Sequence, residues 1–390
     1  MRHCVRKFLL LLFAALLATL AAGCEDLVEQ REELPTLHVN DDDSRDVSKP
    51  WEYPYYLVIG GGYSETLSLL TVSGPGEFSL VNDVQLTGSG INDTVVREGE
   101  LFAACSLTNS VVVYDTQDLS IKREVSVGTS QNPMALAFYE SKRAYLANYV
   151  SNAITYFDLA DEEGGALAVI AMPSGNDLPR DAGVEETWAR PNDVVVAGNR
   201  VYATLGNLQG LHTAGGPGLV AVIDAPSQSL VKSIELTGRD TVGMHLDEDA
   251  GLLYAVSAGE FDDTWFIGNG VVEIINLASE KITGTVHLNG SPFEMVIAAG
   301  GAAFCNNGKE GVILSFDTKT LEVLDPIDIR DPGDELALSF ASALAVDGNG
   351  YLYAAEFNHD KLFVIDTHNS NDIIAVFVVN DGPDTLSFIR

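Results

Sequence analysis

The stretch ILSFDTKTLEV, at residues 313–323, recurs in altered form along the chain. Each copy has alternating apolar residues followed by an aspartate or an asparagine. The first such residue is Asp115, and counting back 44 residues from it reaches Thr71, at the end of a similar run, TLSLLT. Seven units with a period near 48 residues predict a repeat fold. The recurring residues are Asp115, Asp158, Asp224, Asn276, Asp317 and Asp366, with gaps of 43, 66, 52, 41 and 49 residues.

The unit that starts near residue 134 shows how each repeat folds. Short apolar runs separated by turn-forming residues predict strands at 134–139, 143–149, 153–158 and 165–172. Four short strands per unit indicate an all-β, seven-bladed β-propeller with four-stranded blades. The recurring Asp or Asn then ends the third strand and accepts a backbone N–H two residues on, as an Asx turn. We assign it this structural role rather than catalysis.

The two ends of the repeat region complete each other. The last segment, GPDTLSF, matches the inner-strand openings SQNPMALAF and GSPFEMVIA, yet no further strand follows it. The first unit begins at YYLVIGG, which matches a second strand. The C-terminal strand is therefore expected to enter blade 1 as its inner strand and to close the ring, which removes an open sheet edge.

The segment AYLANYVSNAITYFDLAD resembles the YVTN repeat of seven-bladed propellers, including the YncE-like periplasmic proteins. A later segment, ALAVDGNGYLYAAEFNHDKLFVID, is similar to the related NHL repeat. The resemblance covers residues 55–390 and implies the propeller fold. It implies no single function, because such propellers include binding proteins, lactonases, dehydrogenase subunits and scaffolds.

The first 54 residues have a different character. Basic residues precede an apolar run of 13 residues, which is too short to span a membrane because a spanning helix needs about 20. The run ends in LAAGC, which resembles the lipobox of bacterial lipoproteins. This implies that residues 1–23 are a lipoprotein signal peptide and that Cys24 is lipidated; the alternative is an ordinary secretory signal. Residues 24–54 are polar and acidic and are expected to form a flexible tether.

The charge balance excludes some partners. The chain has 22 basic and 56 acidic residues, a net charge of −34, and loss of the three basic residues of the signal gives −34 − 3 = −37. A protein this acidic repels nucleic acid and anionic membrane surfaces. Cys105 and Cys305 fall in distant blades, so we expect two buried free thiols rather than a disulfide.

Three long insertions, at 174–192, 206–218 and 259–270, interrupt the regular plan. In a propeller all three emerge on the face that carries the loops between second and third strands and the links between blades. Aromatic residues beside charges predict a surface for a partner or ligand; the alternative is that the insertions pack on each other as a small core. The residues in question are Trp188, Arg190, His212, Glu260, Phe261, Asp262, Asp263 and Trp265.

Four further candidates, Asn148, Asn306, Glu356 and His359, are expected near the axis. A lactonase-like hydrolase would use such residues, with Glu260, around a metal at the channel mouth. The stretch GEFDD could offer carboxylates to Ca²⁺, although it lacks the spacing of a dedicated calcium loop. The sequence has no HxH or HExxH pattern, no GxSxG elbow and no CxxCH haem site. No catalytic residue, metal site or cofactor is therefore assigned.

These features favour a lipoprotein anchored in the bacterial cell envelope and facing the periplasm or the cell surface. The outer membrane is the expected site, with the inner membrane as the open alternative. The protein is expected to be a monomeric scaffold whose loop-rich face binds an envelope protein, peptide or glycan. Two alternatives stay open. One is the lactonase-like hydrolase, and the other is a docking subunit of a periplasmic redox assembly whose cofactor belongs to a partner.

Overall fold

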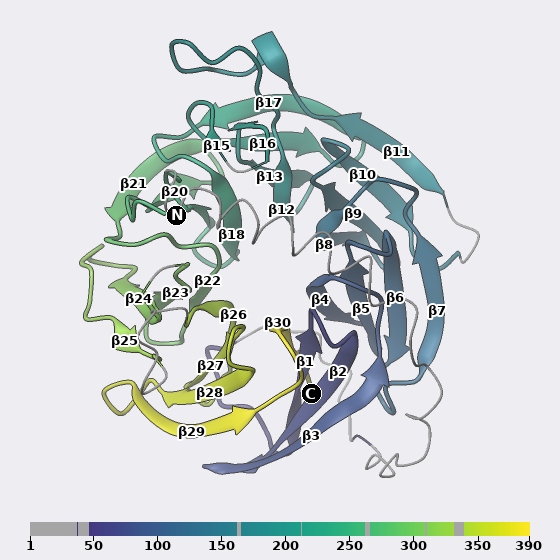
Figure 1. Cartoon of the computed structure of the whole chain (residues 1–390), viewed down its shortest axis with the longest axis vertical. Coiled ribbons are helices and arrows are strands. Elements are labelled where there is room, and N and C mark those ends of the chain that lie inside the picture. The colour runs from purple at the N-terminus through teal and green to yellow at the C-terminus, as the bar shows by residue number, and fades with distance from the viewer. Residues whose placement is uncertain are drawn as a thin grey trace, which may run out of the picture. The chain divides into compact units, whose positions relative to one another are not determined.

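Seven antiparallel four-stranded sheets stand around a ring in the computed structural model (Figure 1). The structure describes residues 37, 47–161, 165–211, 213–261, 266–308, 310–330 and 339–390. The inner strand of each blade contacts the inner strand of the next, and the seventh contacts the first. The predicted all-β seven-bladed propeller with four-stranded blades is confirmed. Within the described ranges, no helix is both long enough and apolar enough to cross a membrane.

The inner half of each blade consists of an inner and a second strand, named in blade order from 1 to 7. The inner strands are β30 (Pro383–Ile389), β4 (Ile91–Arg97), β8 (Pro133–Glu140), β12 (Pro191–Ala197), β18 (Thr241–Asp247), β22 (Met295–Ile297) and β26 (Ala341–Val346). The second strands are β1 (Tyr55–Gly61), β5 (Glu100–Cys105), β9 (Arg143–Asn148), β13 (Arg200–Leu205), β19 (Leu252–Ser257), β23 (Ala302–Cys305) and β27 (Tyr351–Glu356).

The outer half of each blade follows the same order. The third strands are β2 (Thr66–Gly74), β6 (Ser110–Asp115), β10 (Ala153–Asp158), β16 (Leu219–Asp224), β20 (Val271–Asn276), β24 (Val312–Asp317) and β28 (Lys361–Asp366). The outer strands are β3 (Glu77–Leu86), β7 (Ile121–Ser126), β11 (Ala166–Ala171), β17 (Ser229–Glu235), β21 (Lys281–His287), β25 (Ile327–Asp328) and β29 (Asp372–Val378). A small hairpin, β14 (Leu208–Gln209) with β15 (Thr213–Ala214), and a 3₁₀ turn, η1 (Gly175–Asp177), lie in the insertions.

The core lies between the blades, where sheets face each other. Second strands are buried along almost their whole length, which explains why they are apolar at successive positions rather than alternating. In blades 2 to 7 the third residue of the second strand is a buried aromatic, and burying such rings supplies much of the packing energy of a core. These residues are Phe102, Tyr145, Tyr202, Tyr254, Phe304 and Tyr353.

The recurring Asp or Asn ends the third strand and closes the following turn, as predicted. The carboxylate accepts the N–H two residues on after Asp115, Asp158, Asp317 and Asp366, at 2.8–3.1 Å. In blades 4 and 5 the bond reaches three residues on instead, from Asp224 and Asn276. Blade 1 differs, because β2 continues past Thr71 to Gly74. There the turn is made by Pro75 and Gly76, whose φ of 71° only glycine adopts easily.

Ring closure occurs as the sequence predicts. Strand β30 pairs antiparallel with β1, from Tyr56 opposite Ile389 to Gly60 opposite Thr385. Figure 1 shows the C-terminal strand, in yellow, entering the sheet of the N-terminal purple strands. Blade 1 is therefore built from both ends of the repeat region.

The residues just before β1 also pack on the body. Trp51 is buried and makes edge-to-face contacts with Tyr55 and Phe388, at ring-centre distances of 5.4 and 4.7 Å. The Arg390 guanidinium lies 4.4 Å from the centre of the Trp51 ring. Trp51 thus joins the core of blade 1 although it precedes the first strand by four residues.

The two cysteines of the described chain are both buried and free, as expected. Cys105 ends β5 in blade 2 and Cys305 ends β23 in blade 6. Burial raises the pKa of the Cys105 thiol to about 11, and burial followed by the nearby Glu294 raises the pKa of Cys305. Both thiols therefore stay protonated at neutral pH and act as small apolar groups.

Candidate functional site

The loops between second and third strands and the links between blades share one face of the ring, as predicted. The N–H of Val127, after β7, donates to Asn109 O at 2.9 Å, and the N–H of Met172, after β11, donates to Asn152 O at 3.0 Å. Asn109 and Asn152 both belong to loops that connect second to third strands. We call this side of the ring the loop-rich face.

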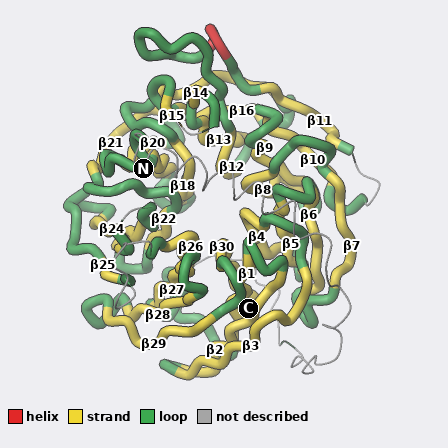
Figure 2. Tube along the Cα trace, in the orientation of Figure 1, coloured by secondary structure: helices red, strands yellow, loops and turns green. Residues whose placement is uncertain are grey.

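Two of the three insertions form one hydrogen-bonded unit on this face. Trp188 and Leu208 exchange N–H···O bonds of 2.9 and 2.8 Å, and the N–H of Asp181 donates to Gly215 O at 2.9 Å. Insertions 174–192 and 206–218 therefore pack on each other. Figure 2 shows η1 in red at the outer end of the first of them.

Arg239, in the link before β18, connects this unit to the third insertion. Its Nη1 and Nη2 lie 2.5 and 3.0 Å from the carboxylate oxygens of Asp181, and its Nε lies 3.6 Å from Glu260. Glu260 is also held by Nδ2 of Asn269, at 3.0 Å. Hydrogen bonding to the Arg239 guanidinium lowers the pKa of Asp181, so the pair stays ionised in mild acid.

Phe261 joins an aromatic cluster that extends into blade 6. Its ring meets Phe266 edge-to-face with centres 5.2 Å apart, and Phe266 meets Phe293 in the same way, also at 5.2 Å. Phe293 lies just before β22. The third insertion is thus tied to blade 6 by ring packing and to Arg239, in the link before β18, by charge. The predicted residues Cys24, His212, Asp262, Asp263 and Trp265 lie outside the residues that the structure describes.

Arg190 lies between two aromatic rings just before β12. Its guanidinium carbon is 5.2 Å from the ring centre of Tyr149 and 5.7 Å from that of Trp188. Nη1 donates to Tyr149 O and Nε donates to Gly210 O, both at 3.2 Å. Burial is the largest cause that raises the pKa of Tyr149, to about 12. The predicted residues Trp188 and Arg190 are therefore brought together, and Tyr149 from blade 3 is added to them.

The backbone at Arg190 is strained. The residue before an inner strand has positive φ in five blades, and Arg190 has a φ of 54°. Glycine, asparagine and aspartate tolerate this left-handed conformation, whereas an arginine there costs on the order of 1 kcal/mol. Strained residues of this kind cluster at ligand and partner sites. The five residues are Gly90, Asn132, Arg190, Asp240 and Gly382.

Blades 2, 4 and 6 each clamp the following blade by side chains near the axis. A carboxylate oxygen accepts an inner-strand N–H of the next blade, and an asparagine Nδ2 donates to one of its carbonyls. These bonds satisfy backbone groups that no further strand covers. The carboxylate bonds join Asp93 to Leu136, Asp193 to Met244 and Glu294 to Leu344, at 2.6–2.9 Å. The amide bonds run from Asn92 to Pro133, Asn192 to Val242 and Asn306 to Ser342, at 2.8–3.0 Å.

The carboxyl of the blade 6 clamp, Glu294, is influenced by acids from three other blades. Burial raises the pKa of Glu294 to about 8, and the charges of Asp193, Asp93 and Asp384 add to the rise. These acids come from blades 6, 4, 2 and 1, so they can act on one another only near the axis. Burial alone raises the pKa of Asp384 to about 7.

Asp240, which precedes β18 on the loop-rich face, is a further enclosed acid. Burial alone raises its pKa to about 7. Its charge is the second cause that raises the pKa of Tyr149, so Asp240 lies near the Arg190 group. Glu294, Asp384 and Asp240 therefore offer protonated or half-protonated carboxyls at neutral pH in the central part of the ring.

The other predicted candidates hold loops in place. Asn148 Nδ2 donates to Thr155 Oγ1 at 2.8 Å. Glu356 accepts from the N–H of Phe340 at 3.1 Å, from the N–H of His359 at 2.8 Å and lies 3.1 Å from His359 Nδ1. Asn148, Asn306, Glu356 and Glu260 stand on blades 3, 6, 7 and 5. Across the described part of the chain, no three His, Cys, Asp or Glu residues are grouped so that they could hold a metal ion.

The loop-rich face also exposes apolar side chains. In each of blades 1 to 5 the loop between second and third strands carries one large apolar residue that is 46–49% exposed, and Trp188 is 36% exposed. The other exposed large apolar residues of the described chain lie on or beside the outer strands. The five loop residues are Tyr63, Leu107, Val150, Leu211 and Ile267.

Sequence reasoning missed Tyr149, Arg239, Asp240, Glu294 and Asp384. A signal existed for some of them. When the openings of the repeats are aligned, the position before the inner strand holds residues suited to positive φ, and an arginine in blade 4 breaks that pattern. Asp93, Asp193 and Glu294 likewise recur at the start of the inner strand in alternate blades. No sequence signal showed that Arg239 reaches Asp181.

No protein-family model matches the chain, and no curated protein matches it. Solved structures do match. A chain of Kuenenia stuttgartiensis hydrazine synthase is 15% identical with a TM-score of 0.60, over 77% of this chain and 95% of that chain. The computationally designed Ika8 protein is 12% identical with a TM-score of 0.56, over 92% of this chain and 95% of that one. At such identities the likeness shows the β-propeller fold alone.

Proposed function

We propose that this chain is a lipid-anchored protein of the bacterial cell envelope, a YVTN/YncE-like propeller that binds another envelope protein through its loop-rich face. The lipobox-like sequence at Cys24 supports the anchor, and the acidic residues after it support a tether. The repeat pattern supports the family. These parts rest on the sequence, whereas the choice of binding face rests on the arrangement of side chains.

One observation carries the binding face. Five consecutive blades each place one exposed large apolar side chain in the same kind of loop, from Tyr63 in blade 1 to Ile267 in blade 5. A monomer rarely gathers exposed apolar groups on one side, because each costs hydration free energy. Two of these side chains, Leu211 and Ile267, lie in the second and third insertions. The first two insertions are joined by the Trp188–Leu208 bonds, and Asp181 of the first pairs with Arg239, so part of this surface is supported before it binds a partner.

The chemistry of the exposed residues favours a protein over a glycan. Leu107, Val150, Leu211 and Ile267 are aliphatic, and aliphatic side chains offer no flat face on which a sugar ring could stack. The stacked group of Tyr149, Arg190 and Trp188 adds the residue types that contribute most at protein interfaces.

The test is a cross-linking capture of the native lipidated protein from its own membranes. It is compared with a variant that carries Leu107→Ser, Leu211→Ser and Ile267→Ser. A matched control carries Leu167→Ser, Val169→Ser and Val231→Ser, which remove residues at least as exposed as these from outer strands. A partner captured by the native protein and the control, and lost from the loop variant, is the expected result.

Other results would count against the proposal. If both variants lose the partner equally, the effect is general and the loop-rich face is not the binding site. If both keep it, the partner binds elsewhere. If purified native protein captures nothing but hydrolyses members of a lactone panel, the scaffold hypothesis fails and the lactonase-like alternative replaces it.

A further inference from the structure

The outer rims of blades 7 and 3 differ from the other rims of the ring, because their edge strands carry a run of uncharged residues. The edge strand of blade 7, β29, has no charged residue from Ile373 to Val378, and Ile373, Ile374, Val376 and Val378 are exposed. The outer strands of blades 1, 2, 4 and 5 all carry charged residues. Proteins place charges on edge strands to prevent another strand from pairing there, and β29 lacks that protection.

The edge of β29 is open in the sheet. The sheet order of blade 7 is β26-β27-β28-β29, so no strand of the described chain lies beyond it. At the end of β29, Val378 O accepts a hydrogen bond from Asn82 Nδ2 of blade 1, at 3.1 Å. Phe377 packs edge-to-face on Phe78 of blade 1, with ring centres 6.2 Å apart. Because side chains alternate along a strand, Val376 and Val378 point to the opposite side, toward blade 6.

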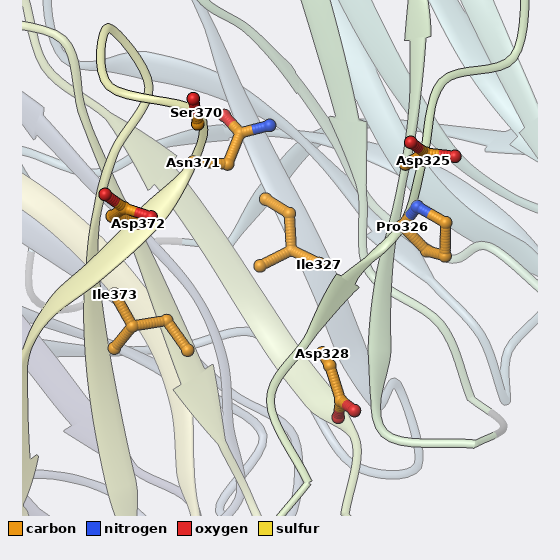
Figure 3. A pocket seen from close by; sticks show the side chains of 8 residues that line it. All are labelled: Asp325, Pro326, Ile327, Asp328, Ser370, Asn371, Asp372 and Ile373. Atoms are coloured by element: carbon orange, nitrogen blue, oxygen red, sulfur yellow. The ribbon is translucent and has the colours of Figure 1, made fainter.

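In the described part of blade 6, the outer strand on this side is short. This strand, β25, consists of Ile327 and Asp328 alone, and Pro326 before it lacks the N–H that would extend the pairing. A cleft of about 340 Å³ lies between this short strand and the beginning of β29. Figure 3 shows Ile327 between the two segments, with Asp325 and Asp328 on one side and Asp372 on the other.

The charges around the cleft are unequal. Asp328 is neutralised by Arg330, whose Nε donates to it at 2.9 Å. Asp372 accepts from the neutral amide of Asn369, at 3.0 Å, and Asp325 carries a further negative charge. The whole chain is also acidic, at −34. A second copy of the chain would be repelled, whereas a basic segment would be attracted.

We infer that β29 and the adjoining cleft form a docking edge for an extended strand of a partner protein, with alternating apolar residues and at least one lysine or arginine. The partner strand pairs with the open backbone edge of β29 and lays its apolar side chains over Ile374 and Val376. Its basic side chain enters the cleft between Asp325 and Asp372. This is strand addition to a sheet edge, in which the backbone supplies affinity and alternate side chains supply selectivity.

The probe is a fluorescent ten-residue peptide of alternating lysine and valine, tested on the full mature protein. The edge variant carries Ile374→Lys and Val376→Lys, which place charges on the exposed side of β29. The matched control carries Leu167→Lys and Val169→Lys on β11, the other uncharged outer strand, on blade 3. Both variants add the same charge at exposed positions, so non-specific attraction changes equally. Circular dichroism shows whether each variant is folded.

The expected result is at least a tenfold weaker affinity for the edge variant and less than a twofold change for the control. The double variant Asp325→Asn and Asp372→Asn should bind the lysine peptide at least threefold more weakly. Its affinity for an alternating serine–valine peptide should be unchanged. The bound peptide should slow the hydrogen exchange of the backbone amides of residues 373–378 and leave the exchange rates of the β11 amides unchanged.

Three results would overturn the inference. The edge variant and the control could lose affinity equally, or a glutamate–valine peptide could bind as tightly as the lysine peptide. The native protein could also dimerise in sedimentation equilibrium and lose that dimer in the edge variant, in which case a second copy occupies β29.

Discussion

The hydroxyl of Tyr55 in blade 1 donates to Oδ2 of Asp347 in blade 7 at 2.5 Å, across 292 residues of sequence. Tyr353 donates to the same oxygen at 2.9 Å, and the N–H groups of Asn349 and Tyr351 donate to Oδ1 at 2.8 and 2.9 Å. Asp347 belongs to DGNG, the turn between β26 and β27. Its carboxylate closes this turn and also joins the first blade to the last.

Replacing Asp347 should therefore destabilise the ring. Asp347→Ala leaves two tyrosine hydroxyls and two N–H groups without their acceptor, and the expected loss in the free energy of unfolding is about 2–4 kcal/mol. Urea denaturation followed by fluorescence measures it. The control is Asp366→Ala, which removes an exposed turn-closing carboxylate of the same blade and should cost about 1 kcal/mol or less. Equal losses would contradict a special role for Asp347.

Ring closure can be tested by truncation. Deleting residues 385–390 removes the part of β30 that pairs with β1 and takes Leu386, Phe388 and Ile389 from the core. Burial of such side chains contributes about 1.5–3 kcal/mol each, so we expect a loss of roughly 5 kcal/mol together with self-association through the exposed edge of β1. Calorimetry and size-exclusion chromatography would show both effects.

A milder truncation serves as the control for ring closure. Deleting Arg390 alone removes the cation–π contact with Trp51 and should cost about 1 kcal/mol or less. If the longer truncation melted like the native protein and stayed monomeric, strand β30 would not hold the ring closed.

The enclosed acids predict how stability depends on pH. The pKa of Glu294 is raised to about 8 by burial and by Asp193, Asp93 and Asp384, against about 4.3 in an unfolded chain. The folded protein therefore binds more protons than the unfolded one between these values, and stability falls as pH rises through this window. Glu294→Gln keeps an acceptor for the Leu344 N–H and removes the titration.

We expect Glu294→Gln to become more stable than the native protein by about 1–2 kcal/mol as pH is raised from 6 to 9, a range reduced to allow for partial exposure of the side chain. Urea titrations at a series of pH values measure the difference. Glu186→Gln, at an exposed position of the first insertion, is the control and should show no such trend. A stability difference between Glu294→Gln and the native protein that stayed constant over this range would contradict a raised pKa for Glu294.

The Arg239–Asp181 pair should govern the order of the first insertion more than global stability. Both side chains are partly exposed, so Arg239→Ala is expected to cost less than about 1 kcal/mol. Cleavage by a glutamate-specific protease at Glu185 and Glu186 should become faster, because the insertion loses its tie to blade 5. Arg200→Ala breaks a similar pair with Asp224, at 2.9 Å, away from the insertions. Arg200→Ala should leave the cleavage rate at Glu185 and Glu186 unchanged. Faster cleavage of this variant would argue that the Arg239–Asp181 pair does not act locally on the insertion.

The sequence by itself determined the number of blades, the strands within each blade, the turns closed by Asp115 and its equivalents, the closing strand and the free thiols. These features are local or periodic. Alternating apolar residues and turn-forming residues determine the strands within one unit, and the period near 48 residues shows that the unit recurs. A closed ring follows because seven such units must each bury both faces of their sheets.

Only the tertiary structure decided how the loop-rich face is organised. Arg190 reaches Tyr149 across 41 residues, Arg239 reaches Asp181 across 58, and the carboxyls of three other blades raise the pKa of Glu294. Such contacts run between blades, and their geometry depends on how tightly the ring closes and how each insertion folds back. The pKa of a carboxyl depends in turn on the enclosure that these contacts create. No pattern within a single repeat contains that information.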